Sequence, residues 1–257
     1  MNAQDHSHPT ETLAGRSAVV TGGGSGIGAA CSRAFAAAGA AVTVADVNAE
    51  AAQAVAEEIG GTAWVADLSD TAALEDLELD TDILVNNAGV QRVSPIHEFD
   101  PQMWRFIQRL MVEAPFLLMR AALPGMYRRN FGRIINISSI HGPVASPYKS
   151  AYITAKHGLQ GLSKVAALEG AEHGVTSNCI NPSYVRTPLV EQQIADQARV
   201  NNIPEEQVLE QIMLTNSPIK RLVEPEEVAS LALWLAGDSA GMVTGSSYTM
   251  DGAWTAR

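Results

Sequence analysis

The chain has 257 residues, of which 46% are hydrophobic and 18% are charged, and this is enough apolar material for one sizeable core. Asp and Glu outnumber Lys and Arg by 28 to 17, and the resulting net charge of −11 repels phosphate backbones and anionic lipid. Nucleic acid and membrane are therefore poor partners, and an anionic substrate would need a local positive charge in its pocket.

Residues 1–13 are predicted to form a flexible tail, because they lack a basic segment followed by an apolar core. No apolar run in the sequence reaches the length of a membrane-spanning helix, so we expect a cytoplasmic protein. Cys31 and Cys179 lie far apart and match no metal-binding spacing. They are expected to be small core residues in a reducing compartment, and no metal site is predicted.

Short apolar runs alternate with helical patterns along most of the chain. The apolar runs are largely uninterrupted stretches of Val, Ile and Ala, which is typical of strands covered on both faces in a parallel sheet. The predicted strands are residues 17–21, 41–45, 62–66, 82–86, 133–138, 176–181 and 246–250. The predicted helices are residues 27–38, 49–59, 72–77, 101–129, 150–173 and 225–236. This alternation predicts one α/β domain over residues 14–257, with a doubly wound parallel sheet and helices on both faces.

Residues 187–216 interrupt this alternation. The segment is polar, mostly helical in pattern and without a strand. An insertion of this kind between two parts of a compact sheet is a candidate for a helical lid over a substrate. The alternative is a surface excursion without function.

A glycine-rich turn follows the first predicted strand and opens the first helix. Such a turn lets a phosphate approach the backbone, while the helix N-terminus favours negative charge. The residues expected to bind a dinucleotide here are Gly22, Ser25, Gly26, Ile27 and Gly28. Asp46 ends the next strand, where its carboxylate can accept hydrogen bonds from the ribose hydroxyls of NAD and repel the extra phosphate of NADP. The alternative for Asp46 is the N-cap of the next helix, for which Asn48 competes.

Two later strand ends support the same site. Asp67 and Leu68 follow the third strand, where a carboxylate can meet the adenine amino group. Asn87, Ala88 and Gly89 follow the fourth strand, at the carboxyl edge where open α/β sheets bind ligands. Asn86 could bind there as well, or it could tie neighbouring strands together. The cofactor predicted from these residues is NAD.

Tyr152 and Lys156 are four residues apart on a predicted helix and therefore share one face. A tyrosine hydroxyl has a pKa of about 10, and an adjacent ammonium together with oxidised nicotinamide favours its phenolate. Ser139 ends the fifth strand, where it can hydrogen-bond the substrate oxygen. Together the three residues predict reversible hydride transfer between an alcohol carbon and nicotinamide.

At this point the chain resembles the short-chain dehydrogenase/reductase family over nearly its whole length after Leu13. The motifs that carry the resemblance are residues 21–28, 67–68, 86–89, Ser139, Tyr152 with Lys156, and 181–182 with Thr187. The resemblance implies a Rossmann-type fold of about seven strands, with Ser139 binding the substrate, Tyr152 as acid and base, and Lys156 holding the nicotinamide ribose. It also implies that Pro182 and Thr187 lie at the nicotinamide, and that the long helices pair between subunits in a homotetramer.

One position departs from the family pattern. The family usually has Asn five residues before the Phe at position 116, and this chain has Met111 there. The Met sulfur is a weak acceptor and no donor, so it cannot hold a relay water as Asn does. A slower enzyme, a relay rebuilt through water and Glu113, and an idle NAD-binding sensor are the open alternatives.

Within the family, the chain resembles the bacterial D-3-hydroxybutyrate dehydrogenases. The resemblance implies that Gln91, His141, Lys149 and Gln193 grip the substrate carboxylate beside Ser139 and Tyr152, with Tyr184 as an aromatic pocket wall. It implies NAD-dependent interconversion of (R)-3-hydroxybutyrate and acetoacetate, and Lys149 would supply the positive charge that the acidic surface lacks. The alternatives are another alcohol, such as a sugar, a cyclic alcohol or a longer hydroxy acid. A reductase of carrier-bound 3-oxoacyl chains is a further alternative, against which Asp46 argues because such enzymes generally use NADPH.

Overall fold

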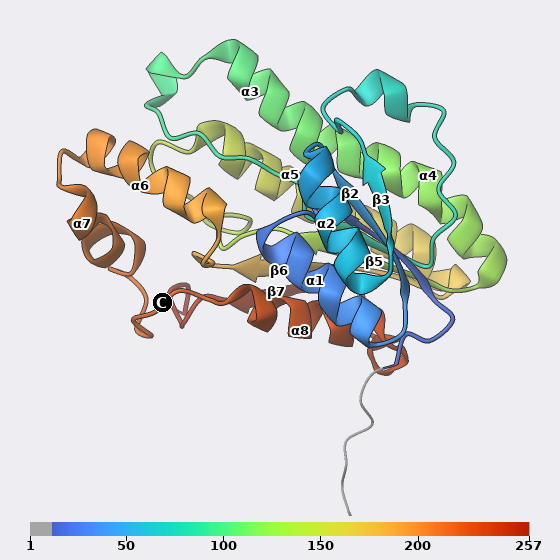
Figure 1. Ribbon diagram of the computed structural model, residues 1–257. Helices are drawn as coiled ribbons and strands as arrows, with labels where there is room; N and C mark the ends of the chain where they lie inside the picture. Colours follow the sequence, from blue (N-terminus) through green and yellow to red (C-terminus); the bar gives the residue numbers. More distant parts are fainter. Residues whose placement is uncertain (1–11, 257) are drawn as a thin grey trace, which may run out of the picture.

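The computed structural model describes residues 12–256, and its centre is a seven-stranded parallel sheet between two layers of helices (Figure 1). The strands are β1 (Ser17–Thr21), β2 (Ala41–Asp46), β3 (Thr62–Val65), β4 (Ile83–Asn86), β5 (Gly132–Ile137), β6 (Val175–Pro182) and β7 (Ser247–Met250). Their order in the sheet is β3-β2-β1-β4-β5-β6-β7. The predicted Rossmann-type doubly wound fold is thereby confirmed.

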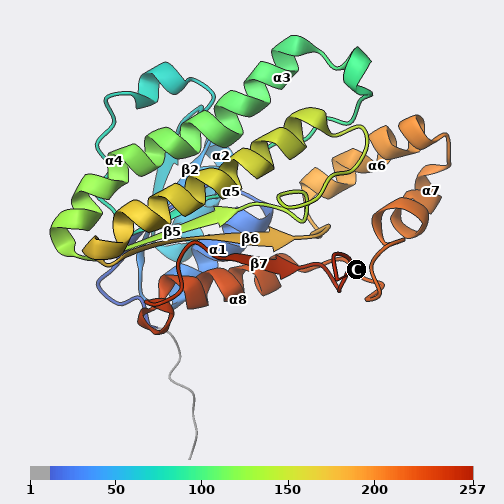
Figure 2. The ribbon, with the colours of Figure 1, turned by 180° about the vertical axis from the view of Figure 1, so that it is seen from behind.

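The helices cover both faces of the sheet, as the uninterrupted apolar strands predict. Figure 2 shows α4 and α5 side by side across one face, while α1, α2 and α8 cover the other. The main helices are α1 (Gly26–Ala37), α2 (Ala49–Ile59), α3 (Pro101–Gln108), α4 (Ala114–Arg129), α5 (Ser150–Gly170) and α8 (Pro225–Ala236). Two further helices, α6 (Pro188–Asn201) and α7 (Glu205–Val208), form the predicted insertion. Among the described helices, none has the length and apolar character to cross a membrane.

Alternate side chains of each central strand enter two separate apolar layers. In β1, Ala18 and Val20 pack beneath α1 and α8, whereas Val19 packs on the side of α4. Neighbouring β4 repeats the pattern, with Val85 on the first side and Leu84 on the second. Because successive side chains of a strand point to opposite faces and both faces are covered, such a strand is largely apolar along its length.

Three predictions about individual elements are wrong. Residues 1–11 of the predicted tail lie outside the described part of the chain. Leu13, expected in the same tail, is buried and its N–H donates to the Ala38 carbonyl, because its apolar side chain joins the core. The helix expected over residues 72–77 is a 3-10 turn at Thr71–Leu74, whose one buried side chain is too small an apolar anchor for a longer helix. The helix expected over residues 101–129 is interrupted by a π-helical turn at Arg109–Glu113, which the apolar pattern does not reveal.

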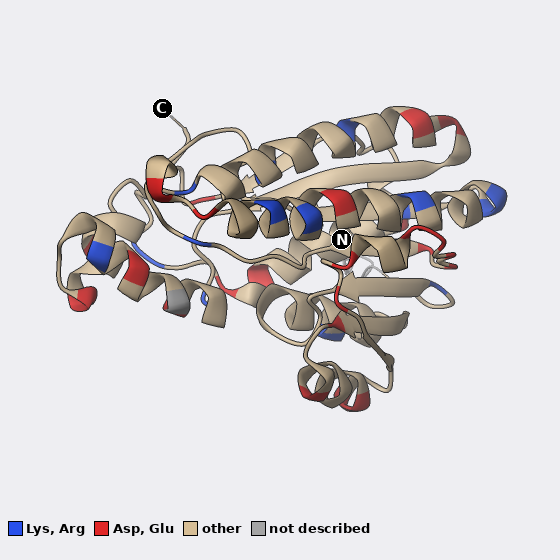
Figure 3. Cartoon of the chain, turned by 90° about the horizontal axis from the view of Figure 1, so that it is seen from above, with Lys and Arg blue, Asp and Glu red and all other residues tan. Residues whose placement is uncertain are grey.

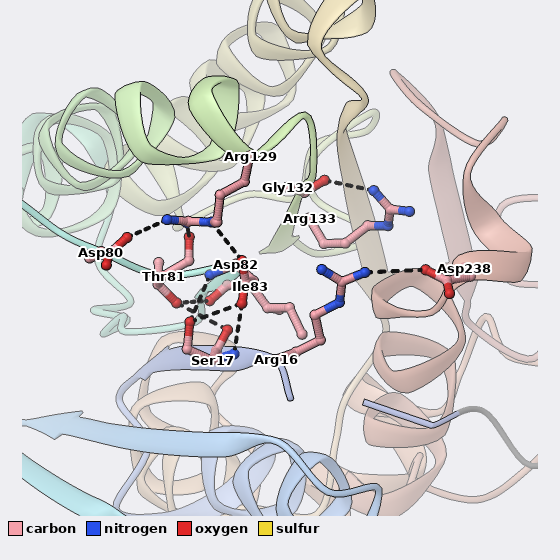
Figure 4. A network of polar contacts seen from close by, with 10 residues as sticks. All are labelled: Arg16, Ser17, Asp80, Thr81, Asp82, Ile83, Arg129, Gly132, Arg133 and Asp238. Atoms are coloured by element: carbon pink, nitrogen blue, oxygen red, sulfur yellow. Dashed lines mark hydrogen bonds and ion pairs between the residues drawn. The ribbon is translucent and has the colours of Figure 1, made fainter. Parts of the chain in front are cut away.

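A buried carboxylate joins strands and helices at the amino edge of the sheet (Figure 4). Asp82, just before β4, accepts hydrogen bonds from the Ser17 N–H at 3.0 Å and from the Ser17 hydroxyl at 3.2 Å. Its second oxygen lies 2.8 Å from Nε of Arg129, at the end of α4. Arg129 also pairs with Asp80 and donates to the Thr81 carbonyl. Asp82 therefore fixes β1, β4 and α4 to one another, at the edge opposite the glycine-rich turn.

Replacing Asp82 with Ala should lower the free energy of unfolding by about 3 kcal/mol, because it leaves buried donors and the guanidinium without their partner. Asp80 is the matched control, since it pairs with the same Arg129 but its side chain is 83% exposed, against 11% for Asp82. Replacing Asp80 with Ala should lower the free energy of unfolding by less than about 1 kcal/mol. Urea denaturation of both variants measures the difference, and equal losses would contradict the role given to Asp82.

Candidate active site

The sheet order reverses between β1 and β4, and two connected cavities lie at the carboxyl ends of these strands. The first, called here the glycine cavity, is the larger of the two. Among the predicted cofactor residues, it is lined by Gly22, Ser25, Gly26, Ile27, Asp46, Asp67, Leu68, Asn87, Ala88, Gly89 and Thr187. The second, the tyrosine cavity, has a volume of about 650 Å³. Among the predicted residues, it is lined by Gln91, Ser139, His141, Lys149, Tyr152, Lys156, Pro182 and Gln193, and it shares several residues with the first.

The glycine-rich turn has a conformation that side chains would disrupt. Gly22 has a φ of +60°, and a Cβ built on Gly28 would lie 2.1 Å from the Gly22 carbonyl oxygen. Gly28 therefore serves the packing of α1 against the turn and lines neither cavity. The Asn87 side chain donates to the Thr21 and Gly22 carbonyls at 2.9 and 3.1 Å, which braces the turn from β4. The N-terminus of α1 at Gly26 is thus held beside the cavity, where it can meet a pyrophosphate.

The acidic residues predicted to bind the dinucleotide lie at the glycine cavity. The Asp46 carboxylate accepts from the Gly24 N–H at 2.9 Å and from the Asn48 N–H at 3.0 Å. Asn48, and not Asp46, is the N-cap of α2, since its side chain accepts from the Ala51 N–H. Asp67 accepts from the Ser69 hydroxyl and N–H, and these hydrogen bonds lower the pKa of Asp67.

Asn86 supports the sheet and does not form part of the site. It is buried, and its side chain donates to Oδ1 of Asn136 at 2.9 Å, which ties β4 to β5. Asn86 therefore ties neighbouring strands together and does not line either cavity.

Tyr152 and Lys156 lie together on α5, with the Lys156 ammonium 5.5 Å from the centre of the Tyr152 ring. Lys156 is buried and donates to the Ile137 carbonyl at 2.6 Å, and burial lowers the pKa of Lys156 to about 8. Burial raises the pKa of Tyr152 to about 12, and the hydrogen bond with Ser139 opposes this shift. A phenolate at Tyr152 would therefore depend on positive charge nearby, which Lys156 supplies and oxidised nicotinamide would increase.

Lys149 is a buried cation that lies deep in the tyrosine cavity. It is 2% exposed, its ammonium donates to the Tyr184 hydroxyl at 2.9 Å, and burial lowers the pKa of Lys149 to about 8. None of the ion pairs among residues 12–256 includes Lys149. Because a buried charge without a counter-ion is unfavourable, this ammonium is suited to an anionic ligand.

Two glutamines add polar atoms that have no partner within the described part of the chain. Nε2 of Gln91 and Oε1 of Gln193 are both buried, and neither has a hydrogen-bond partner. Both residues line the tyrosine cavity, Gln91 from the loop after β4 and Gln193 from α6. Buried polar groups are rarely left unpaired, so these atoms are candidates for ligand contacts.

His141 lies in the same cavity, but both of its ring nitrogens already have partners. Nδ1 lies 3.4 Å from the Ser139 hydroxyl oxygen, and Nε2 lies 2.6 Å from the hydroxyl of Ser146. The ring of Trp254, near the C-terminal end, packs edge-on against the imidazole at 5.6 Å between ring centres. The sequence reasoning missed Ser146 and Trp254, because neither has a diagnostic spacing to the motifs.

The helical insertion lies beyond the carboxyl ends of the strands (Figure 2). Its apolar side chains Val190, Val208 and Met213 form a small cluster against Tyr184, so the insertion packs onto the wall of the tyrosine cavity. The predicted helices over residues 187–216 are present, and their action as a lid stays a prediction.

Met111 occupies the π-helical turn and is 1% exposed. Its side chain lines the tyrosine cavity beside Gly89 and packs in the apolar cluster that includes Ala155. Glu113 is exposed and borders a different groove together with Trp104. Because Glu113 lies outside the tyrosine cavity, this arrangement does not provide a proton relay through Glu113.

Comparisons with known proteins agree with this geometry. A family model described as enoyl-(acyl carrier protein) reductase matches residues 22–255. The chain is 46% identical to a D-beta-hydroxybutyrate dehydrogenase of Rhizobium meliloti (strain 1021), over 94% of this chain and 99% of that protein. It is 43% identical to a protein of the same name from Cupriavidus necator, over 95% of this chain and 100% of the relative. A crystal structure of an Agrobacterium tumefaciens protein with bound NADP superposes with a TM-score of 0.83 at 32% identity, covering 96% of this chain and 98% of that one. The chain belongs to the short-chain dehydrogenase/reductase family and is an oxidoreductase of that family.

Proposed function

We propose that the protein interconverts (R)-3-hydroxybutyrate and acetoacetate with NAD. The observation that carries this proposal is the buried ammonium of Lys149, which has no carboxylate partner among residues 12–256 and lines the same cavity as Tyr152. A short hydroxy acid has one carboxylate and one reacting oxygen, and a cavity lined by both a cation and an acid/base suits both. The two relatives named D-beta-hydroxybutyrate dehydrogenase support the same substrate.

The carboxylate would take the position next to the Lys149 ammonium, and Gln91 would add its unpartnered Nε2 as a second donor. Charge-assisted hydrogen bonds of this kind are stronger than neutral ones and fix the orientation of the substrate. Apart from Lys156 beside Tyr152 and the buried Arg133, lysines and arginines elsewhere are spread over the outer helices and loops among acidic residues (Figure 3). Lys149 is therefore the local positive charge that an anionic substrate needs on this acidic protein.

The chemistry at the other end of the substrate falls to Tyr152, Ser139 and Lys156. Tyr152 takes the hydroxyl proton during oxidation and returns it during reduction, while Ser139 donates a hydrogen bond to the reacting oxygen. Lys156 stabilises the phenolate through its charge. Bound NAD would accept the hydride from the alcohol carbon. The dinucleotide would be held by the glycine-rich turn, Asp46 and Asp67, with Thr187 and Pro182 beside the nicotinamide.

The preference for NAD rests on Asp46. Its carboxylate lines the glycine cavity, and the described side chains around that cavity include no Lys or Arg. A carboxylate at the ribose favours free hydroxyls and repels the additional phosphate of NADP, which no nearby cation would offset.

A hydroxy acid with a further hydroxyl is a second candidate substrate. Oε1 of Gln193 is a buried acceptor without a donor, while Nε2 of the same amide already donates to the Leu189 carbonyl. An acceptor is poorly suited to a carboxylate, whereas a second hydroxyl on the substrate would satisfy it.

Steady-state kinetics with a substrate panel test these alternatives together. We expect the largest kcat/KM with (R)-3-hydroxybutyrate and NAD, and weaker oxidation of gluconate and cyclohexanol. The kcat/KM with NADP should be at least tenfold lower than with NAD, because repulsion between Asp46 and the additional phosphate should cost about 1.4 kcal/mol or more, and this energy corresponds to a factor of ten. Good turnover of cyclohexanol without turnover of 3-hydroxybutyrate would remove the substrate proposal. Binding of NADH without turnover of any substrate would instead favour the idle sensor.

We also propose that the protein is a cytoplasmic homotetramer. Large apolar side chains are exposed along the outer helices on one face of the sheet, among them Phe116 on α4 and Val165 and Leu168 on α5. Pairing of these helices between subunits would cover this surface.

A further inference from the structure

The loop between β5 and α5 contains a short chain of hydrogen-bonding groups that runs from the half-buried Ser146 through His141 to Ser139. Ser146 Oγ lies 2.6 Å from Nε2 of His141, and Nδ1 of the same ring lies 3.4 Å from Oγ of Ser139. The backbone N–H of His141 also donates to Ser139 Oγ at 3.1 Å. His141 therefore contacts the Ser139 hydroxyl twice, and Ser146 contacts the far side of the imidazole.

The imidazole is uncharged, so its two nitrogens must play opposite roles. His141 is 3% exposed, and burial together with the charges of Lys149 and His157 lowers the pKa of His141 to about 3. In a neutral ring one nitrogen carries a proton and donates, while the other only accepts.

The Ser139 hydroxyl has one proton and two lone pairs. To polarise the substrate oxygen or stabilise the Tyr152 phenolate, Ser139 must donate that proton toward the reacting groups. Both lone pairs of Ser139 are then free to accept, one from the His141 backbone N–H and one from Nδ1–H. If Nδ1 carried no proton, its lone pair would draw the Ser139 proton away from the substrate.

We propose that Ser146 is a positioning residue that selects the Nδ1–H tautomer of His141 by donating its own proton to Nε2. The tautomer in turn keeps the Ser139 hydroxyl directed at the reacting oxygen. This inference rests on the role given to Ser139 in the proposed function, but it does not depend on which alcohol is the substrate. It also gives His141 a task other than holding the carboxylate.

A direct test reads the tautomer in the substrate-free protein. Nitrogen-15 NMR of histidine-labelled protein, with the His141 signals assigned through the His141→Gln variant, should show Nδ1 protonated and Nε2 unprotonated at neutral pH. In Ser146→Ala the proton should move to Nε2, whereas Ser146→Thr should keep the original state because it retains the hydroxyl. A wild-type ring with its proton on Nε2 would overturn the proposal.

A second test of the proposal is kinetic and uses the alcohol that the protein oxidises best. Ser146→Ala should lower kcat by on the order of tenfold, less than the loss of a complete oxyanion donor, and should leave KM nearly unchanged. Thr154→Ala, on the exposed side of α5, is the matched control and should retain full activity. In a Ser139→Ala background, Ser146→Ala should have no further effect on kcat, because the hydroxyl it directs is gone. Additive losses from the two substitutions would show that Ser146 acts independently of Ser139.

Discussion

Replacing Tyr152 with Phe should reduce kcat by on the order of 10³-fold, because the substitution removes the group that takes up and returns the substrate proton. The ring and its packing near Lys156 are retained, so the cavity should keep its shape. The affinity for NADH, measured by fluorescence titration, should change little. Loss of turnover with intact NADH binding is the expected signature of an acid/base residue.

Tyr127→Phe is a suitable control, since Tyr127 stacks on His173 near the far end of α4 and lines neither cavity. That variant should have wild-type kinetics. If Tyr152→Phe kept most of its activity, another group would have to supply the proton, and the role of Tyr152 would be refuted.

The fold was predictable because strands such as β1, β2 and β4 carry largely apolar runs and the main helices carry apolar stripes, and these patterns are local. The π-helical turn at Arg109–Glu113 was not predictable for the opposite reason. It adds one residue to a turn without changing which residues are apolar, so the periodicity of residues 101–129 predicts one regular helix. Leu13 illustrates a similar limit, since one apolar residue after a polar tail gives no sign that it packs against α1.

The candidate site was predictable where its chemistry is concentrated in short motifs. The glycine turn with Asp46, and the Tyr152–Lys156 pair with Ser139, are informative in combination and through the family resemblance that they carry, and strand topology brings them to one edge. Ser146 and Trp254 were missed because their contacts with His141 depend on the path of a loop and of the C-terminal segment. Serine and tryptophan are also common outside sites, so neither residue type indicates a role by itself.

Lys149→Met should raise the KM for (R)-3-hydroxybutyrate by on the order of 10²-fold, which corresponds to about 3 kcal/mol for a buried charge pair that loses one partner. Methionine nearly preserves the length of the side chain, so the cavity should keep its volume while the charge is lost. The kcat should fall much less, because the role proposed for Lys149 is at the substrate carboxylate and not at the reacting carbon. Lys164→Met is the matched control on the exposed side of α5, and its kinetics should not change.

An uncharged alcohol separates loss of charge from damage to the site. With 2-butanol, Lys149→Met should be no worse than the wild type, because there is no carboxylate to bind. Equal losses with 2-butanol and 3-hydroxybutyrate would mean that the lysine supports the structure of the cavity and does not recognise an anion.

The pH dependence of KM in the wild-type protein is an independent test of the proposed contact between Lys149 and the substrate carboxylate. Because burial lowers the pKa of Lys149 to about 8, the free protein has a charged Lys149 below that pH and a neutral one above it. The KM for 3-hydroxybutyrate should therefore be flat below pH 8 and rise about tenfold per pH unit above it. The other titratable groups facing Lys149 stay neutral in this range, since burial raises the pKa of Tyr184 and lowers that of His141 to about 3. Lys156 also has a pKa of about 8, but it acts at the reacting end and would change the kinetics of 2-butanol equally. A rise in KM confined to the hydroxy acid would thus identify Lys149 as the titrating group, and a rise shared with 2-butanol would exclude it.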